Sequence, residues 1–139
     1  ARSSDNGATW TRLKSPYEGS LFGVLKAADG ALLIYGMRGN VFRSTDGGDN
    51  WEKIDLGITQ GLNSGNVTAD GRILLAGNGG VIETSSDNGK SFSKQVIPGN
   101  PPIARVLALS DGSLVYVGAL ATGRIEAASK NNASKATEK

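Results

Sequence analysis

The sequence predicts an all-β fold built from four-stranded antiparallel modules that repeat every 41 residues. One octad with the skeleton Ser-x-Asp-x-Gly-x-x-aromatic occurs three times, and its aspartates stand at positions 5, 46 and 87. Each full period also contains four short apolar or alternating runs, which are typical of β-strands. The 20 glycines of this 139-residue chain indicate many turns between those strands. A repeat this regular predicts stacked, near-identical modules.

The three octads have the chemistry of turns that fold on their own. The Asp is expected to accept hydrogen bonds from backbone N–H groups two or three residues further on, and the Gly to take a positive φ. The aromatic side chain then lies against a neighbouring module. The residues predicted to hold these turns are Ser3, Asp5, Gly7 and Trp10, then Ser44, Asp46, Gly48 and Trp51, then Ser85, Asp87, Gly89 and Phe92.

This octad resembles the Asp-box, also called the BNR repeat, which marks the turn between the third and fourth strands of β-propeller blades. The resemblance implies a propeller fold that sialidases, other secreted glycosidases, sortilin-like receptors and photosystem II assembly-factor-like proteins share. Short blades, Gly-x-x-Gly turns and the form Ser-Thr-Asp-Gly-Gly-x-x-Trp are most similar to the photosystem II assembly-factor-like branch. That branch implies a non-catalytic, extracytoplasmic scaffold that binds proteins.

The chain enters the repeat pattern part-way through a module. Residues 1–14 are predicted to form a half blade, with the end of one strand, the first octad and an alternating strand over residues 9–14. Residues 15–20 read as a loop to the next module, because they contain Ser, Pro and Gly.

Two complete blades are predicted at residues 21–56 and 62–97. Asp-Gly dipeptides turn the first strand into the second, and Gly-x-x-Gly segments turn the second strand into the third. We prefer these hairpin turns to a phosphate-binding loop, since no Gly-Lys-Ser/Thr motif accompanies them. The predicted strands cover 21–28, 31–35, 41–43 and 51–56 in one blade, and 62–69, 72–76, 81–84 and 92–97 in the other.

A partial blade is predicted at residues 103–128, after a Pro-rich linker. An alignment that allows a two-residue insertion places Gly123 at the position of Gly80. In that alignment a fourth octad has decayed, with Lys130 in place of the Asp, Asn132 of the Gly and Lys135 of the aromatic residue. Residues 129–139 are therefore predicted to be a polar tail or a degenerate last strand.

These modules amount to about three blades, whereas a propeller ring closes with about four to eight. The predicted ring is incomplete unless the chain associates or belongs to a longer protein. Residues 9–14 are predicted to supply the missing fourth strand of the blade that opens at Ile103. Exchange of that strand between two copies would give six blades from two chains.

Composition excludes several classes of site. Cysteine and histidine are absent, which removes disulfides, the usual zinc ligand sets and His-based catalytic triads. No apolar run of about 18 residues and no basic-then-apolar leader is present, so we expect neither membrane insertion nor a signal peptide. The sequence starts at Ala1 rather than Met, which suggests a processed or excised piece.

The charge distribution does not predict nucleic-acid binding. Residues 1–126 contain 12 basic and 12 acidic side chains, and the net charge of +2 comes from lysines in the tail. No basic face emerges from that balance. We expect protein partners and self-association instead.

Two readings of the octads remain open in the sequence. The aspartates are candidates for carboxylate catalysis or calcium binding, but equivalent positions on successive blades lie too far apart to share one substrate. The aromatic residues are candidates for sugar stacking, although their fixed place favours packing between blades. We therefore predict a binding scaffold with no catalytic, cofactor or metal site. The alternatives are a fragment of a sialidase-like glycoside hydrolase and a structural repeat fragment that self-assembles.

Overall fold

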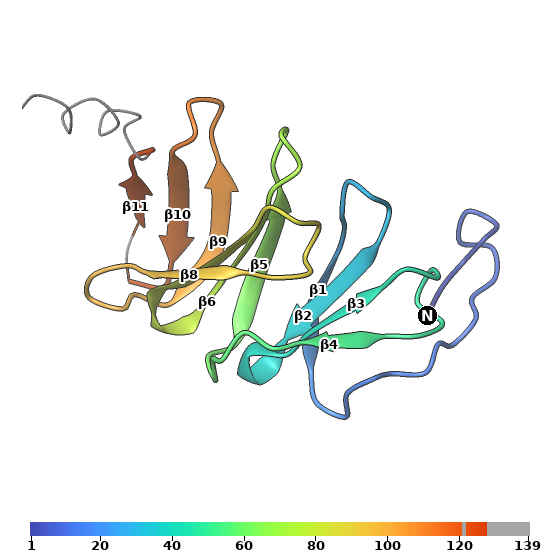
Figure 1. The fold of residues 1–139 in the computed structure, drawn as a ribbon. Coiled ribbons are helices and arrows are strands. Elements are labelled where there is room, and N and C mark those ends of the chain that lie inside the picture. Colours follow the sequence, from blue (N-terminus) through green and yellow to red (C-terminus); the bar gives the residue numbers. More distant parts are fainter. Residues whose placement is uncertain (121, 128–139) are drawn as a thin grey trace, which may run out of the picture.

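The structure is a computed structural model in which residues 1–120 and 122–127 are described. These residues form an open row of three antiparallel sheets, in which strands that neighbour each other in a sheet are consecutive in the chain (Figure 1). The first sheet contains β1 (Leu21–Lys26), β2 (Leu32–Gly36), β3 (Val41–Ser44) and β4 (Glu52–Ile54). The second contains β5 (Leu62–Val67), β6 (Ile73–Gly77), β7 (Val81–Ser85) and β8 (Ser93–Val96). The third contains β9 (Ile103–Ala108), β10 (Leu114–Gly118) and β11 (Thr122–Ile125).

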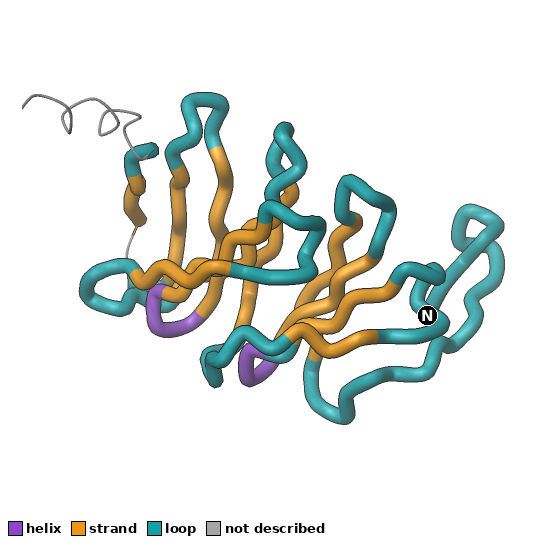
Figure 2. The backbone as a smooth tube through the Cα atoms, in the orientation of Figure 1, coloured by secondary structure: helices purple, strands orange, loops and turns teal. Residues whose placement is uncertain are grey.

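The predicted all-β fold with four-stranded repeats and an incomplete ring is therefore confirmed. Asp-Gly dipeptides turn the first strand of each sheet into the second, and Gly30, Gly71 and Gly112 there have φ between 84° and 87°. The Gly-x-x-Gly segments between the second and third strands are single 3-10 turns, η1 (Met37–Gly39) and η2 (Asn78–Gly80). Figure 2 shows these two short turns between the strands.

The hydrophobic core lies between the sheets, since each sheet is apolar on both faces. Leu33, Tyr35 and Val41 of the first sheet pack against Leu62, Ile73 and Leu75 of the second. A second cluster joins the second and third sheets and contains Leu74, Ala76, Ile82, Ile103 and Val106. Packing between sheets, and not within one, therefore holds the row together.

The N-terminal segment packs beside the first sheet without forming a full strand. Arg2 and Thr11 make a single antiparallel bridge, with two backbone hydrogen bonds of 2.8 Å. The strand predicted over residues 9–14 is reduced to this bridge, and Figure 2 shows loop throughout residues 1–20. A strand needs a neighbour along its whole length. In the described residues, the pairing of this segment is limited to the bridge between Arg2 and Thr11.

The register of β11 corrects the predicted alignment of the C-terminal region. Arg124 pairs with Val115 in β10, and Thr84 pairs with Leu74 in the second sheet. Val115 and Leu74 are 41 residues apart, so Arg124 takes the place of Thr84. The predicted alignment placed Gly123 three positions too early in the repeat and is wrong. Backbone pairing sets this register, and an alignment of the repeat sequences does not detect it.

The predicted fourth octad lies outside the described residues. This applies to Lys130, Asn132 and Lys135, and to the predicted tail at residues 129–139. No helix in the part of the chain that the structure describes is both long and apolar enough to span a membrane.

Candidate functional site

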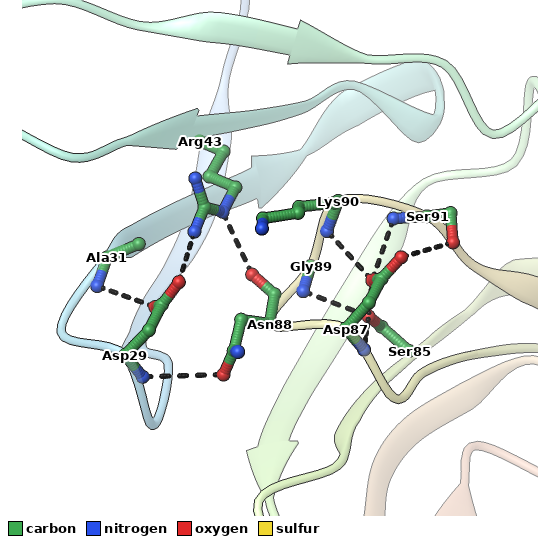
Figure 3. A network of polar contacts seen from close by, with 9 residues as sticks. All are labelled: Asp29, Ala31, Arg43, Ser85, Asp87, Asn88, Gly89, Lys90 and Ser91. Carbon is green, nitrogen blue, oxygen red and sulfur yellow. Dashed lines mark hydrogen bonds and ion pairs between the residues drawn. The ribbon is translucent and has the colours of Figure 1, made fainter.

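The third octad forms a closed network of hydrogen bonds (Figure 3). The hydroxyl of Ser85 donates to Oδ1 of Asp87 at 2.7 Å and accepts from the N–H of Gly89 at 2.9 Å. The N–H of Ser91 donates to the same carboxylate oxygen at 2.9 Å. The hydroxyl of Ser91 donates to Oδ2 of Asp87. Both oxygens of this carboxylate are therefore used inside its own turn.

The other two octads repeat this network at equivalent atoms. Asp5 accepts from the backbone and side chain of Thr9, and Asp46 accepts from the backbone and side chain of Asn50. The N–H of Lys90, three residues on, donates to Asp87 at 3.0 Å as predicted, and the bonds from Thr9, Asn50 and Ser91 reach one residue further than predicted. The sequence skeleton left the residue before the aromatic undefined. Thr9, Asn50 and Ser91 are all short and polar, and that shared property was the available signal.

These hydrogen bonds keep the three carboxylates ionised. Hydrogen bonds from Thr9 lower the pKa of Asp5 to about 2. The backbone N–H and side chain of Asn50 lower the pKa of Asp46, and the side chain and backbone N–H of Ser91 lower the pKa of Asp87. A carboxylate in this state is a poor proton donor near neutral pH, and its lone pairs are already occupied.

The third octad also joins the second sheet to the first (Figure 3). Arg43 in β3 donates from Nε to the carbonyl of Asn88 at 2.9 Å and forms an ion pair with Asp29. The N–H of Asp29 donates to the Asn88 side chain at 3.3 Å. Since the Arg43 side chain is only 7% exposed, this link is largely shielded from water.

A second link of the same kind joins the N-terminal segment to the first sheet. Arg2 donates to the carbonyl of Gly47 at 3.0 Å and pairs with Asp49 at 3.0 Å. Arg2 and Arg43 are 41 residues apart, and so are the two carbonyls that they bind, at Gly47 and Asn88. The sequence analysis missed this link, although the 41-residue step between the two arginines was visible.

The three aromatic residues of the octads occupy different environments. Trp10 is 65% exposed, and its indole N–H donates to the carbonyl of Gly7 at 3.1 Å. Trp51 is half-buried beside Gly48. Phe92 is half-buried and packs on the core between the first two sheets. Of the three aromatic residues, Phe92 agrees with the predicted packing between sheets, and the exposed Trp10 agrees with it least.

Glu83 is a buried acid that the sequence analysis did not single out. Its side chain is 1% exposed, and Oε1 has no hydrogen-bond partner. Burial raises the pKa of Glu83, and the charge of Lys94 on the adjacent strand opposes that shift. Glu83 occupies the place of Phe42 in the first sheet, one repeat earlier. An acidic residue at a repeat position that is apolar in the first sheet was the sequence feature that could have identified Glu83.

Among the cavities beside the described sheets, two have volumes near 500 Å³. A cavity of about 480 Å³ lies between the turn that joins β5 to β6 and the turn that joins β9 to β10, and Asn66, Thr68, Asp70 and Arg72 line one side. A hydrogen bond from the Thr68 hydroxyl lowers the pKa of Asp70. A second cavity, of about 500 Å³, lies between the N-terminal segment and the first sheet and is mainly apolar. Both volumes are in the range of ligand-binding clefts.

Several arginines and aspartates pair at separate places along the row of sheets. Residues 1–120 and 122–127 contain no group of three or more acidic side chains placed to hold a metal ion. A sialidase-like site needs three convergent arginines. Four of the seven arginines instead pair with different aspartates along the row, at Arg2, Arg43, Arg72 and Arg124.

Comparison with protein families matches the BNR/Asp-box repeat to residues 42–53, which contain the second octad. The second octad is therefore matched by the Asp-box repeat. The match places the Asp-box between β3 and β4, the third and fourth strands of the first blade. The first and third octads share its hydrogen bonds and its 41-residue step.

Solved structures with similar folds are β-propeller proteins. Virginiamycin B lyase from Staphylococcus aureus has a TM-score of 0.69 at 17% identity, over 82% of this chain and 41% of that protein. YCF48 from Cyanidioschyzon merolae has a TM-score of 0.62 at 23% identity, over 84% of this chain and 40% of that protein. A structure of YCF48 bound to D1 peptide has a TM-score of 0.60 at 17% identity, over 84% of this chain and 38% of that one.

This chain therefore spans about two fifths of the length of the structures that it resembles. Comparison with curated protein sequences finds no match. Identities of this size show the propeller fold alone, and this fold is found in a lyase in one case and in a peptide-bound protein in another.

Proposed function

We propose that this chain is a non-catalytic propeller scaffold of the photosystem II assembly-factor-like kind, which binds a protein partner. One observation carries the proposal. The octad carboxylates are all engaged within their own turns, while one turn from each of two neighbouring blades frames a cavity of about 480 Å³. The octads are thus structural, and the space between the blade turns is available to a ligand.

The cavity offers groups that recognise a peptide segment. Asn66 presents an amide, which pairs with either the N–H or the carbonyl of a peptide bond. Asp70 and Arg72 lie 2.9 Å apart and offer both signs of charge at the rim. A polar rim around a few apolar side chains is typical of peptide-binding clefts.

The comparison with YCF48 supports a peptide as the ligand, because one structure of that protein contains D1 peptide. Its resemblance to this chain is in fold, so the ligand of this chain is a proposal. The resemblance to extracytoplasmic scaffolds also leads us to propose a location outside the cytoplasm. Fractionation of the native host tests that location, and recovery in the cytoplasmic fraction would contradict it.

Peptide binding is tested by fluorescence anisotropy with labelled D1 peptide and a panel of unrelated peptides. We expect saturable binding that weakens at least tenfold in Arg72→Glu, because the substitution places a second acid beside Asp70. Lys53→Glu, on β4 of the first blade, is the matched control and should bind as the unaltered chain does. Equal binding by both variants would move the ligand away from this cavity.

A glycosidase function is the competing proposal and needs its own test. Fluorogenic sialosides and β-glucosides are offered to the same preparation, and we expect no release of the fluorophore above the rate in buffer. Turnover that is lost in Asp46→Asn would contradict the scaffold proposal, since this carboxylate would then be acting on substrate.

A further inference from the structure

The N-terminal end of the row exposes an apolar face whose equivalents are buried. Leu21, Leu32 and Ile34 of the first sheet are half-buried. The residues 41 positions later, Leu62, Ile73 and Leu75, are all 0% exposed because the first sheet covers them. The cavity of about 500 Å³ lies on this uncovered N-terminal face.

The C-terminal end of the row exposes the complementary face. Leu107 is 49% exposed and Val117 is 44% exposed, with Val115 half-buried between them in the sheet. Their equivalents two repeats earlier, Leu25, Leu33 and Tyr35, pack against the second sheet. The two end faces thus match the two faces that already meet inside the row.

Polar groups on the C-terminal face also reproduce a link seen inside the row. Arg124 pairs with Asp111 at 2.6 Å, as Arg43 pairs with Asp29. Both arginines lie opposite equivalent residues of the adjacent strand, Val115 and Leu33. In the first sheet the arginine goes on to bind an octad carbonyl of the next sheet. Arg124 is 46% exposed and pairs with Asp111 and Glu126 of its own sheet.

The N-terminal segment occupies part of the space that this link would need. Arg2 binds the carbonyl of Gly47, which is the equivalent of the Asn88 carbonyl bound by Arg43. Arg2 and Arg124 therefore hold the same repeat position. Thr11, which pairs with Arg2, corresponds by register to the residue that would pair with Arg124 in a four-stranded sheet.

We propose that the C-terminal face of one copy of this chain docks on the N-terminal face of a second copy. The sheet β9–β10–β11 of the first copy joins residues 9–14 of the second copy and makes a composite four-stranded blade. Leu107, Val115 and Val117 of the first copy cover Leu21, Leu32 and Ile34 of the second. Arg124 of the first copy displaces Arg2 of the second copy from the carbonyl of Gly47.

The geometry of the row favours two copies over one. The N-terminal segment and β11 lie at opposite ends of the row in Figure 1, so one chain does not bring them together. A head-to-tail interface of this kind closes when the rotation per copy completes a circle. Two copies would supply about six blades, within the usual range for a closed propeller. This inference is independent of the proposed peptide function.

The first test is molar mass by light scattering over a range of protein concentrations. We expect a dimer, and at least a tenfold weaker association in Arg124→Glu, because the substitution repels Asp111 and removes the donor to the octad carbonyl. Arg72→Glu also breaks an exposed Arg–Asp pair but lies away from both end faces, so it should remain dimeric. A monomer at every concentration, or equal association of both variants, would overturn the proposal.

The second test is a disulfide across the composite blade. The chain contains no cysteine, so Leu13→Cys and Thr122→Cys can be introduced in separate preparations and mixed under oxidising conditions. These positions correspond to Gln95 and Ile82, which pair across β8 and β7. We expect a crosslinked species of two chains, and Leu13→Cys mixed with Ser91→Cys is the control that should stay uncrosslinked. Equal crosslinking of both mixtures would contradict the proposed register.

The same variants separate this inference from the proposed function. Loss of association in Arg124→Glu with peptide binding retained would support docking independently of the peptide site. Peptide binding lost in Arg72→Glu while the dimer persists would support the proposed function independently of docking.

Discussion

The first and third octads share the sequence Ser-Ser-Asp-Asn-Gly and the same local structure, but they lie in different surroundings. Asn6 and Asn88 take φ of 56° and 60°, and the Gly N–H to Ser hydroxyl bonds measure 2.8 and 2.9 Å. Ser85 is 1% exposed and the third octad docks on Arg43, whereas most of the first octad is exposed. The comparison shows that the octad folds by its own hydrogen bonds and gains its packing from the preceding sheet.

Replacing the octad glycine by alanine should give the largest difference in stability loss between the third octad and the first. In Gly89→Ala the new Cβ would overlap the Leu33 side chain at a φ of +79°, which we expect to cost about 2 to 4 kcal/mol of unfolding free energy. In Gly7→Ala the nearest atom is 3.7 Å away at a φ of +88°, so only the backbone cost of about 1 to 2 kcal/mol remains. Urea denaturation measures both, and equal losses would show that the third octad is not packed as described.

Removal of the two linking arginines, Arg43 and Arg2, should give the next largest difference in stability loss. Arg43→Met removes a 7% exposed guanidinium and leaves Asp29 and the Asn88 carbonyl without a donor, at a cost of about 2 to 3 kcal/mol. Arg2→Met removes a 43% exposed partner and should cost about 0.5 kcal/mol or less. Thermal unfolding of the two variants measures both losses of stability. A larger loss in Arg2→Met than in Arg43→Met would contradict this prediction.

Removal of the octad serine should have a smaller effect. Ser85→Ala leaves the buried N–H of Gly89 unpaired and is expected to cost about 1 to 2 kcal/mol. Ser3→Ala removes the same bond where water can replace the hydroxyl, so we expect roughly half that loss or less. Hydrogen exchange at the amides of Gly7 and Gly89 measures the two bonds directly. Unchanged protection of the Gly89 amide in Ser85→Ala would argue against its hydrogen bond to Ser85.

The smallest effect, and one of opposite sign, is expected at Glu83. Its pKa is raised in the folded state, so protonation favours folding and that stability is lost as pH rises through the folded pKa. Glu83→Gln should therefore stabilise the chain by about 1 kcal/mol at pH 7 and have little effect near pH 4. The octad aspartates have lowered pKa values, so their contribution is lost as pH falls below about 4 in both proteins. Urea titrations at several pH values check this, and a destabilised variant at pH 7 would contradict the burial of an unpaired charge.

Sequence reasoning predicted the parts of the molecule that depend on nearby residues. The 41-residue repeat, the four strands per period and the octad turns follow from local hydrogen bonding and alternating apolar residues, and the structure contains them. Local reasoning was less accurate at β11, where the sequence of the third sheet departs from the repeat of the first two sheets. The pairing of Arg124 with Val115 depends on backbone bonds to β10, so letter-by-letter alignment misplaced it.

The candidate site depended more on contacts between distant residues. Arg43 reaches Asn88 across 45 positions, and the cavity beside Asp70 needs a turn from the next sheet. Neither contact has a local signature, since each joins groups that only sheet stacking brings together.

By itself, the sequence determined the blade repeat and the self-contained Asp-box turn, because both arise from bonds within a few residues. Only the tertiary structure decided which faces are covered. Leu75 and Ile34 occupy equivalent positions, yet Leu75 is fully buried and Ile34 is half-buried. The difference lies in the neighbour that each residue meets, and burial of apolar surface is a property of the pair of sheets and not of either strand alone.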